Sequence, residues 1–303
     1  MPYNTLNLRY EADLASVTFN RPERRNAISP ETVTELLAAL NEIERSTAQV
    51  AILTGAGKAF CSGMDLEGLR DLAAQAGKAA RRSEAEAHEP AGAGVMDVAV
   101  RVLKGQADEP APSNPMSEPT EIAFESSRAL ARMFRRIYDF PKPLIAAVNG
   151  AAIAGGCGIA TLCDFTLAVP EAKFGYTEVR IGFVPAIVSV FLIRQIGEKR
   201  ARDLLLTGRI IDAEEGYRLG LVSEIVPPQK LMDRARELAG QLLENSPTSL
   251  WYTKHLLTNP SQQDIDRGLE LAIEAHARIR SAPDFEEGLS AFLEKRKPVW
   301  RSR

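Results

Sequence analysis

The sequence predicts an α/β fold in which most strands are parallel, and three observations lead to this prediction. Short apolar segments of strand composition alternate with helical segments along the first part of the chain. Two loops that contain glycine each follow an apolar strand, and each leads into a helix. From about Val184 onward the strand signals nearly cease, apart from "LVSEIVP", and helical segments follow one another.

The N-terminal part begins with two segments of strand composition, "LNLRYE" and "LASVTFN", separated by a polar break. In "SPETVTELLAALNEIERS", Ser29 suits the N-cap of a helix and Pro30 suits the first helical position. The apolar residues of this helix are expected on one face, at Val33, Leu36, Leu37, Leu40 and Ile43. The segment "QVAILTG" that follows is expected to be a buried strand.

The next segments continue the alternation. A loop, "GAGKAFCSGMD", leads into a helix that is expected to start near Asp65. "PLIAAVNG" is a strand, "GGCGIATLCD" a short helix and "FTLAVP" a strand. Residues 73–120 form an excursion with a proline-rich second half, and an excursion of this length is usually functional or disordered. We therefore predict a core over residues 1–200, with the excursion at about 73–120, and a helical region over 201–303.

Composition and charge indicate a globular protein in the cytoplasm. Of the 303 residues, 45% are hydrophobic and 25% charged, and no apolar run reaches the length of a membrane span. The N-terminus has no features of a targeting segment. Three cysteines are few and odd in number, which favours reduced thiols. The net charge of −3 gives no footprint for nucleic acid, so neither a nucleic-acid nor a membrane partner is expected.

Most standard catalytic motifs are absent. The dinucleotide fingerprint fails at Phe60 and at Thr161, and the sequence contains no phosphate-binding GxxxxGK[ST], no GxSxG and no HExxH. The three histidines are too scattered for a metal site, so no metal is expected. Cys157 and Cys163 are interpreted as small core residues. What remains for chemistry is glycine-rich backbone and carboxylates.

The two glycine-containing loops, "GKAFCSGMDL" and "GAAIAGGCGI", can supply that backbone. A helix start presents unpaired N–H groups, and glycine lets a ligand approach them closely. Two N–H groups aimed at one point form an oxyanion hole, which polarises a carbonyl and stabilises an enolate. The alternative is that the glycines only permit tight turns between strand and helix.

The motifs together resemble those of the crotonase, or enoyl-CoA hydratase/isomerase, superfamily. They stand here as "FNRPERRNAIS", "ILTGAGKAFCSGMDL", "PLIAAVNGAAIAGGCGIATLCDFTLA", "FGYTEVRIGFVP", "LLLTGRIIDAEEGYRLGLVSEIVP" and "FLEKRKPVW". Only the 73–120 excursion falls outside the resemblance. It implies an α/β crotonase-like spiral of ββα repeats and a helical C-terminal region that mediates trimerisation, with trimers often paired into hexamers. It also implies an acyl-CoA thioester substrate, a role in fatty acid metabolism and no separate cofactor, because CoA is part of the substrate.

The resemblance also implies roles for individual residues. The backbone N–H groups of Met64 and Gly155 match the oxyanion hole. Asp65 would cap the helix after Met64. The residues expected to contact CoA or the acyl chain are Arg24, Arg25, Ala27, Asp65, Leu66, Gly156, Phe292 and Lys295, the last two often reaching the CoA of a neighbouring subunit.

The carboxylates leave the reaction open. Hydratases of the family typically use two glutamates; the second is present as Glu178, whereas the first position is Gly158. One carboxylate can hydrate a 2-enoyl-CoA if the proton taken from water is the one passed to C2. A single carboxylate is also the pattern of Δ3,Δ2-enoyl-CoA isomerases. Hydratase is the preferred interpretation, isomerase the alternative, and a homologue that binds acyl-CoA or RNA with little catalysis the third.

Two further hypotheses concern the surroundings of Glu178. A side chain from the excursion could enter the space beside Gly158, and the candidates are Glu84, Glu86, His88, Glu89, Asp97 and Glu121. More often such a segment covers the acyl pocket or is disordered. Arg180 could pair with a carboxylate of the substrate, or it could form a structural ion pair.

Overall fold

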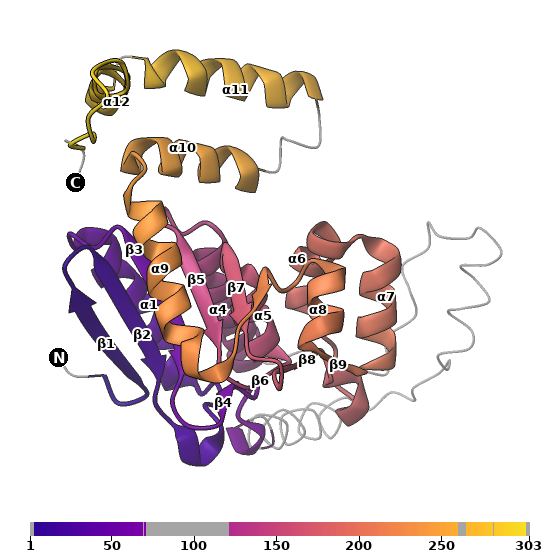
Figure 1. Cartoon of the computed structure of the whole chain (residues 1–303). Coiled ribbons are helices and arrows are strands. Elements are labelled where there is room, and N and C mark those ends of the chain that lie inside the picture. The colour runs from indigo at the N-terminus through magenta and orange to yellow at the C-terminus, as the bar shows by residue number, and fades with distance from the viewer. Residues whose placement is uncertain (1–2, 69, 71–120, 260–264, 281, 301–303) are drawn as a thin grey trace. The chain divides into compact units, whose positions relative to one another are not determined.

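A computed structural model describes residues 3–68, 70, 121–259, 265–280 and 282–300 (Figure 1). The chain divides into two compact units, one made of Met1–Asp65 and Leu130–Arg303 and the other of Leu66–Ala129. Helix α4 (Glu121–Tyr138) runs from the second unit into the first. The predicted 73–120 excursion lies outside the described residues, and the boundary predicted at residue 200 stays a prediction.

The larger sheet of the first unit has six strands in the order β1-β2-β3-β5-β7-β10. β1 is antiparallel to β2, and the other neighbours are parallel. Every residue of β5 and all but one of β3 are buried, as expected for parallel strands covered on both faces. The strands span Leu6–Glu11, Leu14–Phe19, Val50–Gly55, Leu144–Val148, Phe165–Ala168 and Glu224–Ile225.

The smaller sheet has four short strands in the order β4-β6-β8-β9. β4, β6 and β8 are parallel, and β9 is antiparallel to β8. These strands cover Ala59–Cys61, Ala151–Ile153, Lys173–Gly175 and Ile210–Asp212. The sequence analysis placed loops at β4 and β6 and expected almost no strand after Val184, so it missed this sheet. Three residues are too few to show the alternation that marks a strand.

The two sheets are built from the same repeating unit. The strand pairs β3 and β4, β5 and β6, and β7 and β8 each give one strand to the large sheet and the next to the small one. Each step therefore moves the chain across both sheets in the same direction. The predicted α/β spiral of ββα repeats is confirmed.

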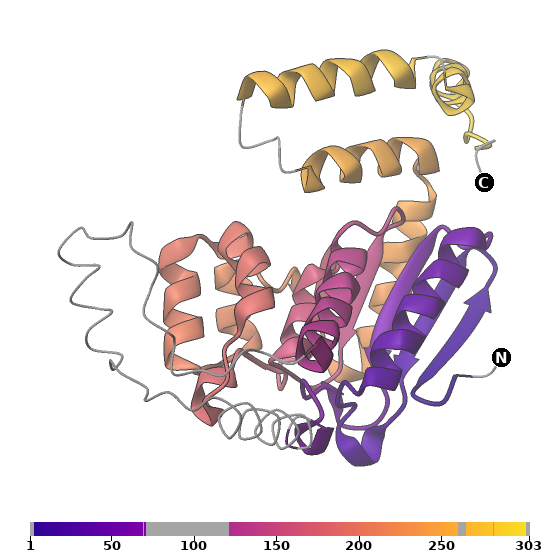
Figure 2. The same cartoon turned by 180° about the vertical axis from the view of Figure 1, so that it is seen from behind.

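Helices cover both faces of the large sheet. α9 (Leu231–Leu243) crosses β3, β5 and β7 on the face seen in Figure 1, whereas α1 (Pro30–Arg45) lies on the face seen in Figure 2. The other helices are α5 (Gly155–Leu162), α6 (Ala186–Ile196), α7 (Glu198–Thr207), α8 (Ala213–Leu219), α10 (Pro247–Thr258), α11 (Ile265–Ile279) and α12 (Pro283–Leu293), and the 3-10 turns are η1 (Pro22–Arg24), η2 (Glu178–Ile181) and η3 (Pro228–Lys230).

The start of α1 follows the sequence closely. The Ser29 side chain accepts a hydrogen bond from the Thr32 N–H, and Pro30 occupies the first turn. Of the predicted apolar face, Leu37 is only half-buried and the other four residues are buried. The helix therefore packs on the sheet as its periodicity predicts.

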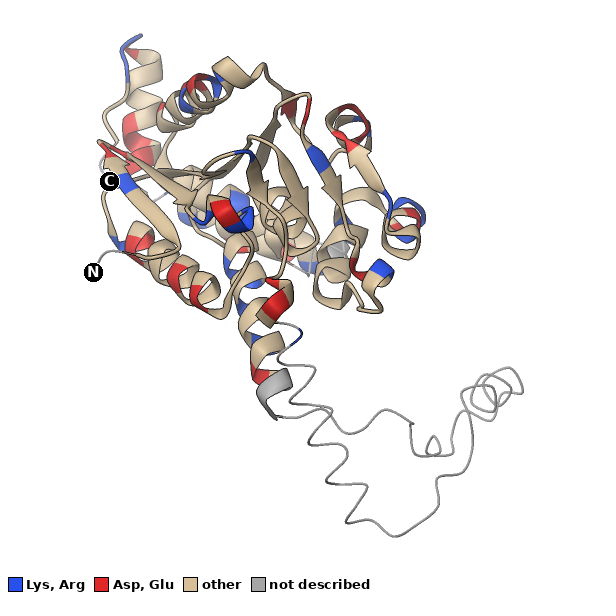
Figure 3. Ribbon diagram, turned by 90° about the horizontal axis from the view of Figure 1, so that it is seen from below, with Lys and Arg blue, Asp and Glu red and all other residues tan. Residues whose placement is uncertain are grey.

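Charges of both signs are mixed along the described helices, and the strands are largely free of them (Figure 3). The described part of the chain shows no helix long and apolar enough to span a membrane. Cys61, Cys157 and Cys163 are all buried and form no disulfide, which confirms the interpretation of Cys157 and Cys163 as core residues.

Candidate active site

The small sheet brings the three predicted catalytic residues to one edge. β4, β6 and β8 are parallel neighbours, so their carboxyl ends lie side by side. Met64 comes shortly after β4, Gly155 shortly after β6 and Glu178 shortly after β8. The carboxyl edge of parallel strands is where ligands bind in many α/β proteins. The strands that the sequence analysis missed are thus the ones that position the candidate site.

The backbone segments at Met64 and Gly155 are in direct contact. A Cβ built on Gly63, whose φ is +92°, would lie 2.8 Å from Ala154 Cβ and 3.6 Å from Gly155 N. Only glycine therefore fits between the two segments. Met64 is held by a parallel bridge to Ile28, in which Ile28 N–H donates to Gly63 O at 2.7 Å and Asp65 N–H to Ile28 O at 3.0 Å.

Both predicted oxyanion donors are available. Among the described residues, the N–H groups of Met64 and Gly155 find no acceptor. Gly155 is the first residue of α5, where the unpaired N–H groups carry the positive end of the helix dipole. Two free N–H groups on touching segments are suited to polarise one carbonyl oxygen. Their predicted role as an oxyanion hole stays a prediction.

The residue before Gly155 is held in a rare conformation. Ala154 has φ of 50° and ψ of −123°, a combination that costs a non-glycine residue about 1–3 kcal/mol. Its N–H donates to Gly175 O at 2.7 Å, which ties the end of β6 to the end of β8. This bond holds the turn that presents the N–H of Gly155.

Close packing fixes α5 against β4. A Cβ on Gly156 would lie 2.1 Å from Cys61 O, so this glycine allows the helix to touch the strand. Every residue of α5 is buried. The structure thus gives Gly156 a packing role, and its predicted contact with CoA stays a prediction.

Glu178 is the carboxylate of the site. It opens η2, and its Oε2 is buried with no hydrogen-bond partner among the described residues. Burial disfavours the charged form and raises the pKa of this carboxyl above its ordinary value, although its own backbone N–H acts in the opposite direction. A carboxyl of raised pKa is suited to taking up and returning a proton.

Glu178 lies close to the helix that carries Gly155. Its charge acts on both Cys157 of α5 and Tyr176, and Tyr176 OH lies 3.3 Å from Thr161 Oγ1. Burial raises the pKa of the Cys157 thiol to about 12, so this thiol stays neutral and is not a nucleophile. Among the described residues at this edge, Glu178 is thus the candidate for proton transfer, and its catalytic role stays a prediction.

Gly158 does not leave an open space in this site. A Cβ there would lie 2.9 Å from Val188 Cγ1, closer than real Cβ contacts, and 3.0 Å from Phe134 Cε1, tighter than most of them. The space beside Gly158 is thus filled, which is contrary to the hypothesis that a side chain from the excursion enters it. Five of the six candidates, Glu84, Glu86, His88, Glu89 and Asp97, lie outside the described residues, as does the side chain of Glu121 in α4.

The loop predicted to line the CoA arm adjoins Met64. Arg21 Nη2 pairs with Asp65 Oδ2 at 3.1 Å, and Arg21 Nη1 donates to Ala27 O at 2.9 Å. Asp65 directly precedes a helical segment, the place of a cap. Arg24 and Arg25 are exposed on this loop. The two arginines could meet phosphate groups there, and their contact with CoA stays a prediction.

Two asparagines that the sequence analysis did not select hold these loops. Asn26 is 1% exposed, and its Nδ2 donates to Ala56 O at 3.0 Å and Ala59 O at 2.8 Å. Asn149 Nδ2 donates to Gly55 O at 2.9 Å and Gly57 O at 3.0 Å. The available signal was that asparagine tolerates positive φ, which Asn26 adopts at 56°.

The remaining predicted residues are exposed. Phe292 on α12 is 82% exposed and Leu66 is 62% exposed. No hydrogen bond or ion pair joins Phe292 or Lys295 to the site within the described part. Arg180 is exposed and lies against Gly208, without an ion pair to any described residue, so the predicted structural ion pair is not formed there.

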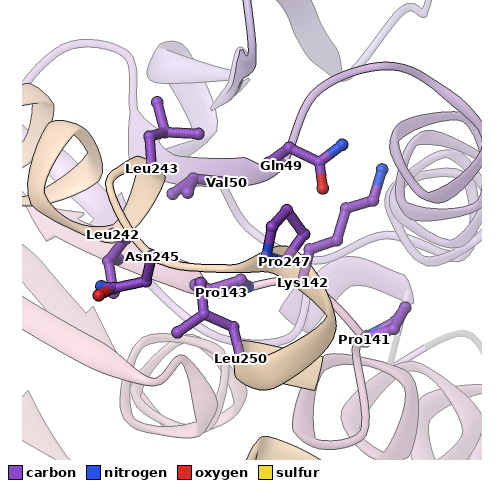
Figure 4. A pocket seen from close by; sticks show the side chains of 10 residues that line it. All are labelled: Gln49, Val50, Pro141, Lys142, Pro143, Leu242, Leu243, Asn245, Pro247 and Leu250. Carbon is purple, nitrogen blue, oxygen red and sulfur yellow. The ribbon is translucent and has the colours of Figure 1, made fainter. Parts of the chain in front are cut away.

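One small pocket lies elsewhere, between the N-terminal ends of β3 and β5 and helices α9 and α10 (Figure 4). Its volume of about 20 Å³ suits a single water molecule. Lys142 Nζ donates to Ile43 O at 2.8 Å, Ser46 O at 3.0 Å and Ala48 O at 2.6 Å, which ties this region to the end of α1. The lining residues are Gln49, Val50, Pro141, Lys142, Pro143, Leu242, Leu243, Asn245, Pro247 and Leu250, none of them a predicted site residue.

Comparisons with known proteins agree with this geometry. The family model of enoyl-CoA hydratase/isomerase matches residues 9–90 and 116–303. The chain is 41% identical to a Thermus thermophilus protein named "Putative enoyl-CoA hydratase", over 94% of this chain and 96% of that one. It is 31% identical to the crotonyl-CoA hydratase of Syntrophomonas wolfei, over 100% of both chains.

Solved structures give the same result. The crystal structure of an enoyl-CoA hydratase from Bacillus anthracis matches with a TM-score of 0.78 and 28% identity, covering 99% of this chain and 100% of that one. That similarity extends over the spiral and the helical C-terminal part. The chain therefore belongs to the enoyl-CoA hydratase/isomerase family.

Proposed function

We propose that this protein is an enoyl-CoA hydratase, which adds water across the 2,3 double bond of a 2-enoyl-CoA thioester. One observation carries the proposal: Oε2 of Glu178 is buried near the helix that begins at Gly155, and neither this oxygen nor the N–H of Gly155 has a hydrogen-bond partner among the described residues. Unsatisfied buried groups of this kind are rare in native proteins and call for an explanation. A substrate carbonyl and a water molecule would satisfy both.

In the proposed reaction the thioester oxygen accepts hydrogen bonds from the N–H groups of Met64 and Gly155. The oxygen of water bonds to C3 while Glu178 takes a proton from that water. The electron pair of the double bond moves toward the thioester, and the resulting enolate oxygen is stabilised by the two N–H groups. Glu178 then returns its proton to C2, so one carboxylate completes the addition.

The direct test incubates the purified protein with a short trans-2-enoyl-CoA and searches for 3-hydroxyacyl-CoA by mass. We expect product from the wild type and none above background from Glu178→Gln. The relatives named crotonyl-CoA hydratase and short-chain-enoyl-CoA hydratase support the choice of a short acyl chain. A wild type that forms no product from short or longer 2-enoyl thioesters would overturn the proposal.

A Δ3,Δ2-enoyl-CoA isomerase is the second candidate. It is favoured by the filled space beside Gly158, which leaves Glu178 as the one carboxylate that the described residues place at the site. Moving a double bond needs a single group that takes a proton from one carbon and returns it to another. Incubation with a 3-enoyl-CoA distinguishes the two, because an isomerase forms the 2-enoyl thioester without a gain of water.

A homologue that binds acyl-CoA or RNA with little catalysis is the candidate of another class. It would bind the thioester through the same N–H groups. Because its wild type would turn over little substrate, Glu178→Gln would cause no further loss of turnover. Mixed charges along the described elements give no support to RNA (Figure 3).

The proposal also covers the oligomeric state, the cellular compartment and the metabolic role. We propose a homotrimer or a hexamer, because α12 exposes Phe285, Leu289, Phe292 and Leu293. We also propose a cytoplasmic protein of fatty acid metabolism that uses no metal and no cofactor besides the CoA of its substrate. Buried, free thiols at all three cysteines support a reducing compartment.

A further inference from the structure

In the first turn of α5, apolar side chains cover the side of the helix that carries Gly155 and Gly158. Gly155 and Gly158 are three residues apart on the helix, so their missing side chains would point the same way. A Cβ on Gly155 would lie 3.6 Å from Phe134 Cζ, and one on Gly158 would lie 3.2 Å from the same atom. The ring of Phe134 therefore lies along both glycines.

Two more side chains complete this cover. Ile28 Cδ1 would lie 3.0 Å from a Cβ on Gly155, and Val188 Cγ1 would lie 2.9 Å from one on Gly158. Phe134 is 1% exposed, Ile28 0% and Val188 5%. Buried side chains in a packed interior yield little space. The cover is therefore a fixed part of the fold and not a loose contact.

We propose that Phe134, together with Val188, excludes a second carboxylate from this site and so assigns all proton transfer to Glu178. The inference rests on the proposed function for its chemical meaning. Its geometric content, that the ring occupies the space of a side chain at position 158, is independent of any activity. Phe134 acts here as a positioning residue, since it is the residue that determines which groups can stand beside Glu178.

The first test is a thermal double-mutant cycle with Gly158→Ala and Phe134→Ala. In the wild type we expect Gly158→Ala to lower Tm, because the new methyl group meets Phe134 and Val188. In Phe134→Ala the same change is expected to lower Tm by less, because the contact with the ring is gone while the contact with Val188 Cγ1 at 2.9 Å remains. An equal change of Tm in both backgrounds would overturn the proposal.

Gly156→Ala is the matched control. Its Cβ would meet Cys61 O and Cys61 C, at 2.1 and 2.7 Å, and these are backbone atoms of β4. Removing the ring of Phe134 gives that Cβ no space, so the Tm loss from Gly156→Ala is expected to be the same in both backgrounds. A rescue of Gly156→Ala by Phe134→Ala would show general loosening of α5 and would also overturn the proposal.

The second test introduces the carboxylate itself. We expect Gly158→Glu to lower kcat/KM by about 100-fold in the wild type, the size of effect that misplacing groups by about 1 Å produces. In Phe134→Ala the same change is expected to cost less than about tenfold, because the carboxylate then has room. In the Phe134→Leu background, which restores a larger apolar side chain, Gly158→Glu should again lower kcat/KM by most of the factor expected in the wild type.

An equal loss of kcat/KM from Gly158→Glu in all backgrounds would contradict the proposal. If the wild type turns over no enoyl-CoA at all, the proposed function fails, while the thermal cycle still decides whether Phe134 fills the space at position 158. The two failures are thus told apart.

Discussion

The first turn of α5 and the helix α12 differ in what they present to their surroundings. All eight residues of α5 are buried, and its first turn contributes backbone N–H groups with almost no side chain. α12 has only Asp284 and Ala291 buried, and it exposes Phe292 to 82% and Leu293 to 72%. Within the described residues, the packing around α5 is complete, whereas most apolar side chains of α12 are exposed.

This difference separates two kinds of inference. Around α5 the described neighbours belong to this chain, so distances and hydrogen bonds between them can be used to argue the site. At α12 the side chain of Asp284 accepts a hydrogen bond from Ser246 Oγ at 2.8 Å, which anchors the helix start to α10. The exposed apolar residues of α12 are the surface that we propose for contact with a further copy. The site can therefore be tested by single substitutions that change turnover, and α12 by substitutions that change the oligomeric state.

The largest expected effect is on Glu178. Changing Glu178→Gln keeps the shape of the side chain and removes the ability to carry the proton. We expect kcat to fall by about 10³-fold, within the range for loss of a general acid–base group. Turnover of a 2-enoyl-CoA by the purified variant measures this. A loss below tenfold would mean that the proton moves through another group.

The next effect tests the backbone at Gly155. Gly155→Pro deletes the N–H at a helix position that tolerates proline, whereas Gly155→Ala keeps the N–H and adds a similar Cβ. We expect kcat to be about 10²-fold lower in the proline variant than in the alanine variant, the cost of one oxyanion donor. Equal rates in the two variants would show that this N–H contributes nothing to the reaction.

The corresponding test at α12 is on assembly. Leu289→Asp combined with Phe292→Asp places two charges on side chains that are 51% and 82% exposed, so the fold of one chain should not change. We expect the mass in solution to fall from that of an oligomer to that of a monomer, measured by light scattering after gel filtration. Unchanged circular dichroism is the control, and an unchanged oligomer mass would place the contact between copies elsewhere.

The smallest expected effect is on stability and its dependence on pH. Because its pKa is raised, Glu178 binds its proton more tightly in the folded state than in the unfolded state. Its contribution to stability is therefore fully present below pH 4.5 and is lost as the pH rises through its pKa in the folded state. Glu178→Gln should therefore raise Tm near neutral pH, by about 2 °C for an unsatisfied buried oxygen worth about 1 kcal/mol. The gain should disappear toward pH 4.5.

For the wild type, kcat/KM should fall as pH drops through the raised pKa of Glu178, because the base must be ionised.

Long periodic or wholly apolar segments could be predicted from the sequence. The large sheet and the start of α1 at Ser29 follow from such segments, because each has enough residues to show a pattern. The small sheet could not be predicted in this way, since its strands are three residues long. They are formed through pairing with neighbours that are distant in sequence, as Ala152 pairs with Phe174.

The same limit applies to the site. Met64, Gly155 and Glu178 were selected through the resemblance of motifs, and the structure places all three at one edge of the small sheet. Phe134 and Val188 carried no local signal, because an apolar residue in a helix is ordinary until its neighbour is known. Position 158 is an example: in the sequence the glycine suggested an empty space, whereas in the structure the side chains of Phe134 and Val188 fill it.

The N–H groups of Met64 and Gly155, which find no acceptor among the described residues, have a consequence for how such a protein changes over generations. A backbone N–H is encoded by every amino acid except proline, so most substitutions at Met64 leave the donor in place. Under the proposed mechanism, activation of the thioester is therefore robust to mutation, whereas proton transfer depends on one codon, that of Glu178. Selection would then alter the reaction by replacing a single carboxylate, while the means of holding an acyl thioester is inherited unchanged.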